Sequence, residues 1–473
     1  MAVGLPFVDG GLLLAQQAAM PASTLKELEK QAAAGEAAAM FALGERFRLG
    51  LDTEIDLRKA AEWYGKAAQN DHAAAMTQLG RMYRNGQGVG KNDLEAINCF
   101  RRAVELEHPP AMNYLGMMYV SGRGALPDAA RAAKLFRQAA DKGDALAMIN
   151  LADALAAGRG IQADAAQAKT WYAKPRETFE KAANTGDGDA MLGLVTILRY
   201  GKGTEAHPDQ AAAWCQKAAD QGRADAMFLL GRMYLDGEGV AQDADQARSW
   251  WLKAAERGDP ECMYLLAVGH RTGKPFAKDA KQSLVWCQKA AAAGHAEALN
   301  MLGELHAAGD GVPKDDKKAH EWFLQAAQLG DGPALRHIGE FYAAGRAVTK
   351  DNQAAVSFYR SAADAGDSSG AYELARCYAD GRGVTKDEAQ SAHWFSQAAF
   401  GGHAAAGYEL GRLYADGRGV SQKAEMAAFW YRAAANQGNV PAMKALSEAL
   451  RTGMGVAKDE KQAAEWRAKA EQE

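Results

Sequence analysis

Residues 226–258 read AMFLLGRMYLDGEGVAQDADQARSWWLKAAERG, and this stretch decides the fold. Its first half is an apolar helical segment that stops at Gly237, and glycine is expected just past a helix end because it tolerates a positive φ. Asp243 stands where a side-chain oxygen can accept hydrogen bonds from the first N–H groups of the next helix. A second helical segment, residues 246–255, ends before Gly258. The stretch therefore predicts a helix-turn-helix unit, whose two helices we call helix A and helix B.

This unit recurs along almost the whole chain. A Leu-Gly pair, or its equivalent, marks the same point of helix A in each unit, at Gly44, Gly80, Gly116, Ala152, Val195, Gly231, Ala267, Gly303, Gly339, Ala375, Gly411 and Ser447. The step is 36 residues throughout, except for seven additional residues between Ala152 and Val195. Because repeats of this length stack on their neighbours, the pattern predicts an all-α fold, an α-solenoid of about twelve 36-residue helix-turn-helix repeats.

The consensus of the units, Leu-Gly-x-x-Tyr-x-x-Gly-x-Gly-Val-x-x-Asp-x-x-x-Ala-x-x-Trp-Tyr-x-x-Ala-Ala-x-x-Gly, resembles the Sel1-like repeat, a short relative of the tetratricopeptide repeat. The resemblance covers residues 37–470 and implies a right-handed superhelix of antiparallel helix pairs. It also implies a protein that binds other proteins, as an adaptor or scaffold, with helix A lining a concave groove. We accordingly expect an N-terminal extension (1–22), a capping helix (23–36), repeats 1–4 (37–187), and repeats 5–12 with a C-terminal cap (188–473).

Two features of the array depart from the regular unit. Thr24 and Glu27 are spaced as a capping box, which predicts that the N-terminal capping helix begins at this point. The seven-residue insertion lies in helix B of repeat 4 and contains Pro175, which should kink or break that helix. The insertion is either tolerated length variation or a hinge that bends the solenoid between repeats 4 and 5.

Composition narrows the class of protein. The 473 residues carry a net charge of -4, so there is no basic excess for binding nucleic acid. No apolar run approaches the ~20 residues that span a bilayer. The five cysteines replace core residues of the repeat and do not form a disulfide framework, which favours a reducing compartment. We expect a cytoplasmic protein, or a periplasmic one if residues 1–22 are a degenerate or removed signal.

No set of side chains in the sequence predicts catalysis or a cofactor. His270 and His306 each replace a helix A tyrosine near Cys262 and Cys287, but their spacing is not a zinc signature. The motif Ser23-x-x-Lys26 matches one element of penicillin-binding enzymes without the Ser-Asp-Asn element that accompanies it. We therefore expect a protein that is not an enzyme.

The candidate partner surface consists of the helix A positions that the packing columns leave unused. We call the glycine of the Leu-Gly pair, or the residue that replaces it, the marker glycine. The unused positions lie two residues before it, one residue after it and four residues after it, and we call them the variable helix A positions. Several are apolar or arginine and are predicted to face a partner: Tyr114, Met117, Val120, Arg199, Leu229, Arg232, Leu235, Leu265, Val268, Arg271 and Met301. Arginines beside apolar residues suit a protein or peptide with carboxylates. Tight closure of the superhelix would instead bury the same positions.

The sequence thus predicts a monomeric, non-catalytic adaptor that holds a partner protein or peptide in its concave groove. Two alternatives from other classes stay open. One is an immunity or secretion-accessory protein that sequesters a specific effector, and the other is a cell-wall-related, penicillin-interacting hydrolase.

Overall fold

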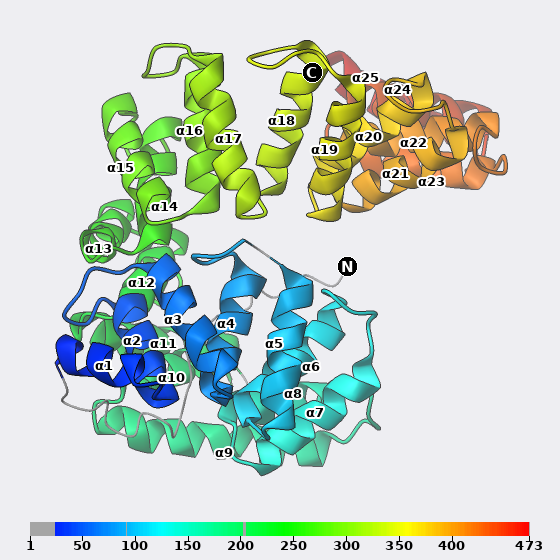
Figure 1. Ribbon diagram of the computed structural model, residues 1–473. Coiled ribbons are helices and arrows are strands. Elements are labelled where there is room, and N and C mark those ends of the chain that lie inside the picture. The colour runs from blue at the N-terminus through cyan, green and yellow to red at the C-terminus, as the bar shows by residue number, and fades with distance from the viewer. Residues whose placement is uncertain (1–23, 91, 202–204, 473) are drawn as a thin grey trace. The chain divides into compact units, whose positions relative to one another are not determined.

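The computed structural model describes residues 24–90, 92–201 and 205–472. In these ranges the chain forms 25 α-helices and no strand (Figure 1). One helix, α1, precedes twelve pairs in which the even-numbered helix is helix A and the following one is helix B. The predicted all-α solenoid of twelve repeats is confirmed. The expected extension at residues 1–22, and Ser23 after it, lie outside the described residues.

Most helices have 13 residues, as the bounds show. The first sixteen are α1 (Leu25–Ala33), α2 (Ala37–Leu49), α3 (Leu57–Gln69), α4 (Ala73–Asn85), α5 (Asp93–Glu105), α6 (Pro109–Ser121), α7 (Ala129–Asp141), α8 (Ala145–Ala157), α9 (Ala165–Asn184), α10 (Gly188–Tyr200), α11 (Pro208–Asp220), α12 (Ala224–Asp236), α13 (Ala244–Glu256), α14 (Pro260–Thr272), α15 (Ala280–Ala292) and α16 (Ala296–Ala308). The others are α17 (Asp316–Gln328), α18 (Gly332–Ala344), α19 (Asn352–Asp364), α20 (Ser368–Asp380), α21 (Glu388–Phe400), α22 (Ala404–Asp416), α23 (Ala424–Ala435), α24 (Val440–Thr452) and α25 (Glu460–Gln472).

The chain divides into two compact units. Unit 1 ends at Ala298 and unit 2 begins at Leu299, so the division falls within α16, in repeat 8. Within each unit a helix packs mainly on the helices before and after it in the sequence. The division does not coincide with the insertion in repeat 4, and the bend expected there stays a prediction.

Within residues 226–258, the C-terminal end of α12 and the start of α13 are as the sequence predicts. Gly237 ends α12 in the left-handed conformation, with φ of 70°. Asp243 begins α13, and its carboxylate accepts hydrogen bonds from the backbone N–H of residues 245 and 246 at 2.9 and 3.0 Å. At the N-terminal end, the capping box of Thr24 and Glu27 on α1 is also present.

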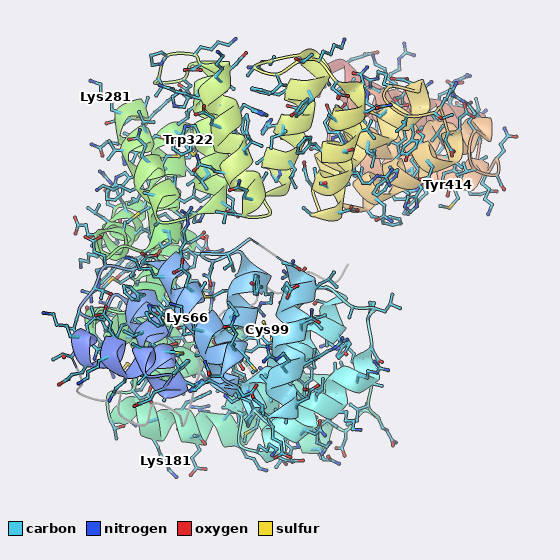
Figure 2. All side chains as sticks on the ribbon, in the orientation of Figure 1. Lys66, Cys99, Lys181, Lys281, Trp322 and Tyr414 are labelled. Carbon is cyan, nitrogen blue, oxygen red and sulfur yellow. The ribbon has the colours of Figure 1, made fainter. Side chains whose placement is uncertain are left out.

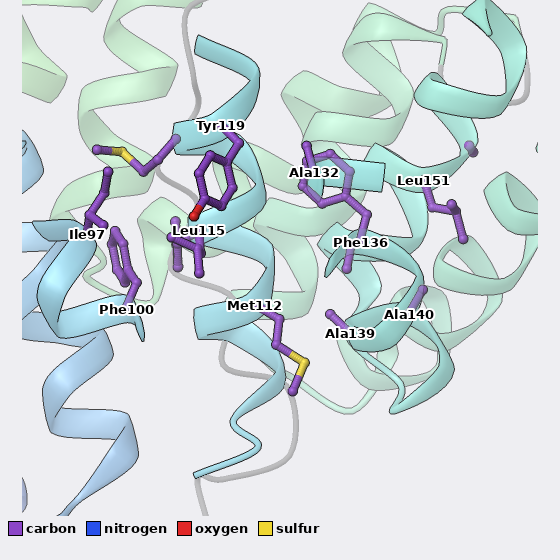
Figure 3. Close-up of a cluster of buried hydrophobic side chains, with 14 of the residues drawn as sticks. Ile97, Phe100, Met112, Leu115, Tyr119, Ala132, Phe136, Ala139, Ala140 and Leu151 are labelled. Atoms are coloured by element: carbon purple, nitrogen blue, oxygen red, sulfur yellow. The ribbon is translucent and has the colours of Figure 1, made fainter. Parts of the chain in front are cut away.

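The marker glycine allows helix A to lie directly against an aromatic ring of helix B. A Cβ on Gly231 would come within 2.3 Å of the indole nitrogen of Trp251, so no larger residue fits while the ring stays in place. The indole N–H of Trp251 donates to the backbone oxygen of Phe228, 3.1 Å away. The packing columns fill the rest of the core, as in repeats 2–4, where Phe100, Leu115 and Phe136 are buried together (Figure 3).

The helix with the insertion, α9, is longer than its equivalents but is not broken. It runs for 20 residues with Pro175 inside it and buried. The additional residues extend helix B by about two turns, which keeps the buried face of the helix in register. Of the two outcomes expected at Pro175, a kink or a break, the break does not occur, and the kink stays a prediction.

Candidate functional site

In the first repeats of unit 1, the variable helix A positions are filled by the protein's own polar side chains. Glu45, Gln78 and Arg84 are buried. Glu45 accepts hydrogen bonds from Arg48 at 2.6 Å and from the Tyr64 hydroxyl at 2.5 Å. Burial alone would raise the pKa of Glu45, but its ion pair with Arg48 and the Tyr64 hydrogen bond hold that pKa below the usual range.

Tyr114 belongs to the same buried region. Its ring stacks on Phe100 with centroids 5.5 Å apart. The guanidinium groups of Arg81 and Arg84 lie over the ring at 5.4 and 5.2 Å. These contacts join repeats 2 and 3 from within the chain and leave little of the tyrosine for a partner.

Repeat 1 also touches repeats that lie about 200 residues further along unit 1. A Cβ built on Gly258, in the turn after α13, would lie 3.2 Å from Cβ of Ile55, and one on Gly294 would lie 3.1 Å from Nε of Arg58. The equivalent turns of other repeats lack such a contact. A Cβ built on the turn glycine would have no other atom within 4 Å at Gly35, Gly143, Gly366 and Gly402. We call the contacts of Ile55 with Gly258 and of Arg58 with Gly294 the clasp.

Electrostatics agree with this closure of unit 1. Burial would raise the pKa of Asp225, at the start of α12, but that pKa is lowered by Arg223 and also by Arg48 of repeat 1. Arg48 therefore acts on a carboxylate five repeats away. Repeat 1 thus meets repeats 6 and 7, which agrees with the closure of the superhelix that the sequence left open as an alternative. The burial of Glu45 and Tyr114 comes instead from side chains of repeats 1 and 2.

The predicted partner surface is correspondingly corrected at several residues. Tyr114 and Leu229 in unit 1, and Met301 in unit 2, are buried and so cannot offer free contact area. Arg199 is held in an ion pair with Glu238. The other predicted residues are less enclosed: Val120 and Arg232 are exposed, and Met117, Leu235, Leu265, Val268 and Arg271 are half-buried. Their role in partner binding stays a prediction.

Unit 2 presents the same positions differently. In repeats 9–12, all of which the structure describes, none of the variable helix A positions is buried. Three of these repeats carry a Glu–Arg ion pair on helix A, with N–O distances of 2.6–3.2 Å: Glu373–Arg376, Glu409–Arg412 and Glu448–Arg451. We call these six residues the open face. The sequence does not single out these residues as a partner surface, because the exposure of helix A depends on the curvature of the solenoid.

Aromatic rings position two of these arginines. The guanidinium of Arg376 lies 5.7 Å from the ring centroid of Tyr372, and that of Arg412 lies 5.9 Å from the ring of Tyr408. Tyr372 is itself stacked on His403, the N-cap of α22, at 4.3 Å. Each arginine is more exposed than its glutamate, at 45% against 24% for Arg376 and Glu373, and 47% against 30% for Arg412 and Glu409. In repeats 10 and 11 the open face thus exposes the arginine of each ion pair more than the glutamate.

Metal sites and membrane spans are two further features that the sequence-based expectations address. No three His, Cys, Asp or Glu side chains in those ranges are grouped so that they could hold a metal ion. His270 is buried beside Phe276 and lies 3.3 Å from the backbone oxygen of Ala277. None of the described helices combines the length and apolar character needed to cross a membrane.

The cysteines are free thiols in or near the core. Four are buried, and Cys99 on α5 is half-buried (Figure 2). Burial raises the pKa of the Cys99 thiol to about 11 and that of Cys215 to about 12. Since the thiolate is the reactive form, these side chains are poor nucleophiles near neutral pH.

A family model described as the Sel1 repeat matches twelve successive segments of the chain. They are residues 37–72, 73–108, 109–144, 145–174, 186–222, 224–259, 260–295, 296–331, 332–367, 368–403, 404–439 and 440–471. Among curated proteins, none matches this sequence.

Solved structures provide three further likenesses. A protective antigen with an SLR fold from uropathogenic Escherichia coli strains is 30% identical, with 95% of this chain and 94% of that chain covered and a TM-score of 0.49. A Sel1 repeat protein from Oxalobacter formigenes is 30% identical over 48% of this chain and 99% of its own, with a TM-score of 0.43. An immunity protein from Pseudomonas aeruginosa is 23% identical, with 46% of this chain and 82% of that chain covered and a TM-score of 0.32. At these TM-scores the likenesses carry no argument about function.

Proposed function

The chain belongs to the Sel1 repeat family, whose members are generally protein-interaction scaffolds, and we propose that it binds a partner protein or peptide on the open face of unit 2. One contrast supports this choice. Five of the nine variable helix A positions are buried in repeats 1–3, whereas none of the twelve is buried in repeats 9–12. A partner can therefore reach the open face without any rearrangement of the solenoid.

The charge of the open face indicates the chemistry of the partner. Arg376 and Arg412 expose more of their side chains than the glutamates they pair with. A partner carboxylate can accept hydrogen bonds from the outward side of each guanidinium, which presents several N–H donors in one plane. We infer that the partner segment carries acidic side chains, in agreement with the sequence-based expectation of an acidic partner.

A comparison of matched variants tests this proposal. Arg376→Glu/Arg412→Glu reverses two charges on the open face, and Arg382→Glu/Arg418→Glu reverses two in the turns of the same repeats, where the arginines pair with Asp380 and Glu388. Partners are captured by cross-linking and quantified by mass spectrometry. We expect the face variant to lose its specific partners about tenfold relative to wild type, and the turn variant to keep them.

A third variant locates the site if the first comparison fails. Leu235→Asp/Leu265→Asp changes half-buried residues of the surface that the sequence predicts in repeats 6 and 7. Loss of partners in this folded variant alone would move the site to unit 1 and contradict the proposal. Equal capture by all variants would remove helix A from partner binding altogether.

The remaining functional alternatives gain no support from the structure. The family is typically non-catalytic. The hydrolase alternative depends on Ser23, which lies outside the described residues, and the immunity or secretion-accessory alternative stays a prediction. The monomeric state and cytoplasmic location also stay predictions.

A further inference from the structure

Two phenylalanines on the helix B segments α21 and α23 of unit 2 break the pattern of the repeat. Phe400 is 75% exposed at the end of α21, and Phe429 is 57% exposed on α23. At the position of Phe400 the other repeats carry Gln69, Glu105, Asp141, Asn184, Asp220, Glu256, Ala292, Gln328, Asp364, Asn436 and Gln472. At the position of Phe429 they carry Glu62, Asn98, Lys134, Thr170, Ala213, Ser249, Val285, Glu321, Ser357, His393 and Glu465. A phenylalanine occurs once in each column.

Phe400 and Phe429 both contact the same side chain, that of Trp430. Both rings meet the indole of Trp430 edge-on, with centroids 5.1 Å away for Phe400 and 5.2 Å away for Phe429. Trp430 is 5% exposed. We call Phe400, Phe429 and Trp430 the aromatic triad. Because the repeat does not require either phenylalanine for packing, core stability does not explain why two exposed rings gather here.

The triad also contains an unused hydrogen-bond donor. The indole N–H of Trp430 is buried and has no hydrogen-bond partner, and the same holds for Trp394 at the equivalent position of repeat 10. A buried donor without an acceptor is unfavourable, so a ligand that supplies an acceptor gains from it. The two rings that pack against the indole are themselves exposed to solvent.

The size of the exposed surface selects the kind of occupant. A phenylalanine side chain offers on the order of 200 Å², so the two rings expose roughly 250 Å². A stable contact between two folded proteins takes about 800 Å² from each partner, which is well beyond what the triad offers a second copy of this chain. A short extended peptide needs only one or two apolar anchors, and its backbone carbonyls are free to accept hydrogen bonds.

We propose that the aromatic triad is a docking site for a short extended peptide segment of another protein. An apolar side chain of the peptide packs against the rings of Phe400 and Phe429, and a peptide carbonyl accepts a hydrogen bond from the indole N–H of Trp430. This site is separate from the open face and goes beyond the proposed function, since it uses helix B residues and apolar recognition.

A random peptide library displayed on phage tests the proposal with the full chain as bait. Peptides that enrich on wild type are synthesised, and their affinities for wild type and variants are measured. We expect Phe400→Ala/Phe429→Ala to weaken binding at least about tenfold, because exposed aromatic anchors dominate such contacts. Trp430→Phe, which keeps an aromatic ring and removes the N–H, should weaken it by roughly three- to tenfold.

Matched controls and alternative outcomes are measured in the same series. Leu324→Ala/Met454→Ala removes two other exposed apolar side chains of unit 2 and should leave peptide binding unchanged. The proposal is wrong if no peptide distinguishes wild type from the Phe400→Ala/Phe429→Ala variant. It is also wrong if the triad instead mediates a dimer in sedimentation, or binds phosphatidylcholine vesicles, and the double variant abolishes that association.

Discussion

At the scale of single residues, the histidines before helix A have a structural role that the repeat explains. A histidine directly precedes helix A in four repeats, at His72, His108, His295 and His403. His72, His295 and His403 each accept a hydrogen bond from a backbone N–H of the first turn, and His108 does not. Three of the rings stack on an aromatic residue of the preceding helix A, at centroid distances of 4.3–4.7 Å. His108 instead places Nδ1 2.9 Å from the hydroxyl of Thr77, and both side chains are buried.

His108 should make stability depend on pH. Burial, with a smaller contribution from His72, lowers the pKa of His108 to about 4. In the unfolded chain a histidine binds its proton near pH 6.5, so between pH 6.5 and 4 the unfolded state gains a proton that the folded state does not. Stability therefore falls as the pH falls through this window, by roughly 2 kcal/mol at pH 5.

The variant His108→Asn isolates this effect, because asparagine is a good N-cap that does not titrate. Urea unfolding at pH 7.5 and pH 5 should show a larger loss of stability in wild type than in the variant. Equal losses in the two proteins would mean that His108 is protonated as readily in the folded chain as in the unfolded one.

At the scale of helices, replacing glycine by alanine should have opposite effects at two sites, the marker glycine Gly231 and the helix B residue Gly65. Gly231→Ala would place a methyl group 2.3 Å from the indole nitrogen of Trp251, forcing the ring of α13 away and breaking its hydrogen bond to Phe228. We expect a loss of about 1–3 kcal/mol in the free energy of unfolding. Gly65 lies inside α3 with nothing within 4 Å of a Cβ. Gly65→Ala should therefore stabilise by roughly 0.5–1 kcal/mol through helix propensity.

Chemical denaturation of both variants, followed by tryptophan fluorescence, measures the two effects. The control is internal, because the substitution is the same and only the neighbour of the new methyl group differs. If both variants shift the midpoint in the same direction, close approach of helices A and B does not set the requirement for glycine at residue 231.

The same scale shows what the sequence can and cannot predict. The cap at Asp243 and the helix end at Gly237 depend on neighbouring residues only, so the repeat pattern predicts them correctly. Exposure of helix A does not follow from any local pattern, because it depends on small rotations that accumulate over many repeats. Tyr114, Leu229 and Met301 are buried where a surface was expected, and Tyr114 is covered by Phe100, Arg81 and Arg84 of the preceding repeat. Pro175 failed as a helix-breaker because one missing hydrogen bond did not outweigh the packing of the extended α9.

At the scale of the molecule, the clasp makes unit 1 more than a chain of nearest-neighbour contacts. In a simple solenoid each repeat touches only its neighbours, and stability is a sum of local terms. The contact of Ile55 with Gly258 joins repeat 1 to the turn between repeats 6 and 7, and the action of Arg48 on Asp225 adds charge attraction over a similar separation. We infer that the two ends of unit 1 stabilise each other.

The variant Ile55→Asp should therefore disturb a segment 200 residues away. Replacing a half-buried isoleucine by a charge removes on the order of 1 kcal/mol of apolar contact, which corresponds to about fivefold more frequent opening of the clasp. Hydrogen–deuterium exchange of the full chain should then show faster uptake both in residues 49–59 and in residues 254–260. Leu51→Asp, in the same loop at a side chain that is already 39% exposed, is the matched control and should leave residues 254–260 unchanged. If Ile55→Asp changes exchange only in its own loop, the clasp does not hold unit 1 closed.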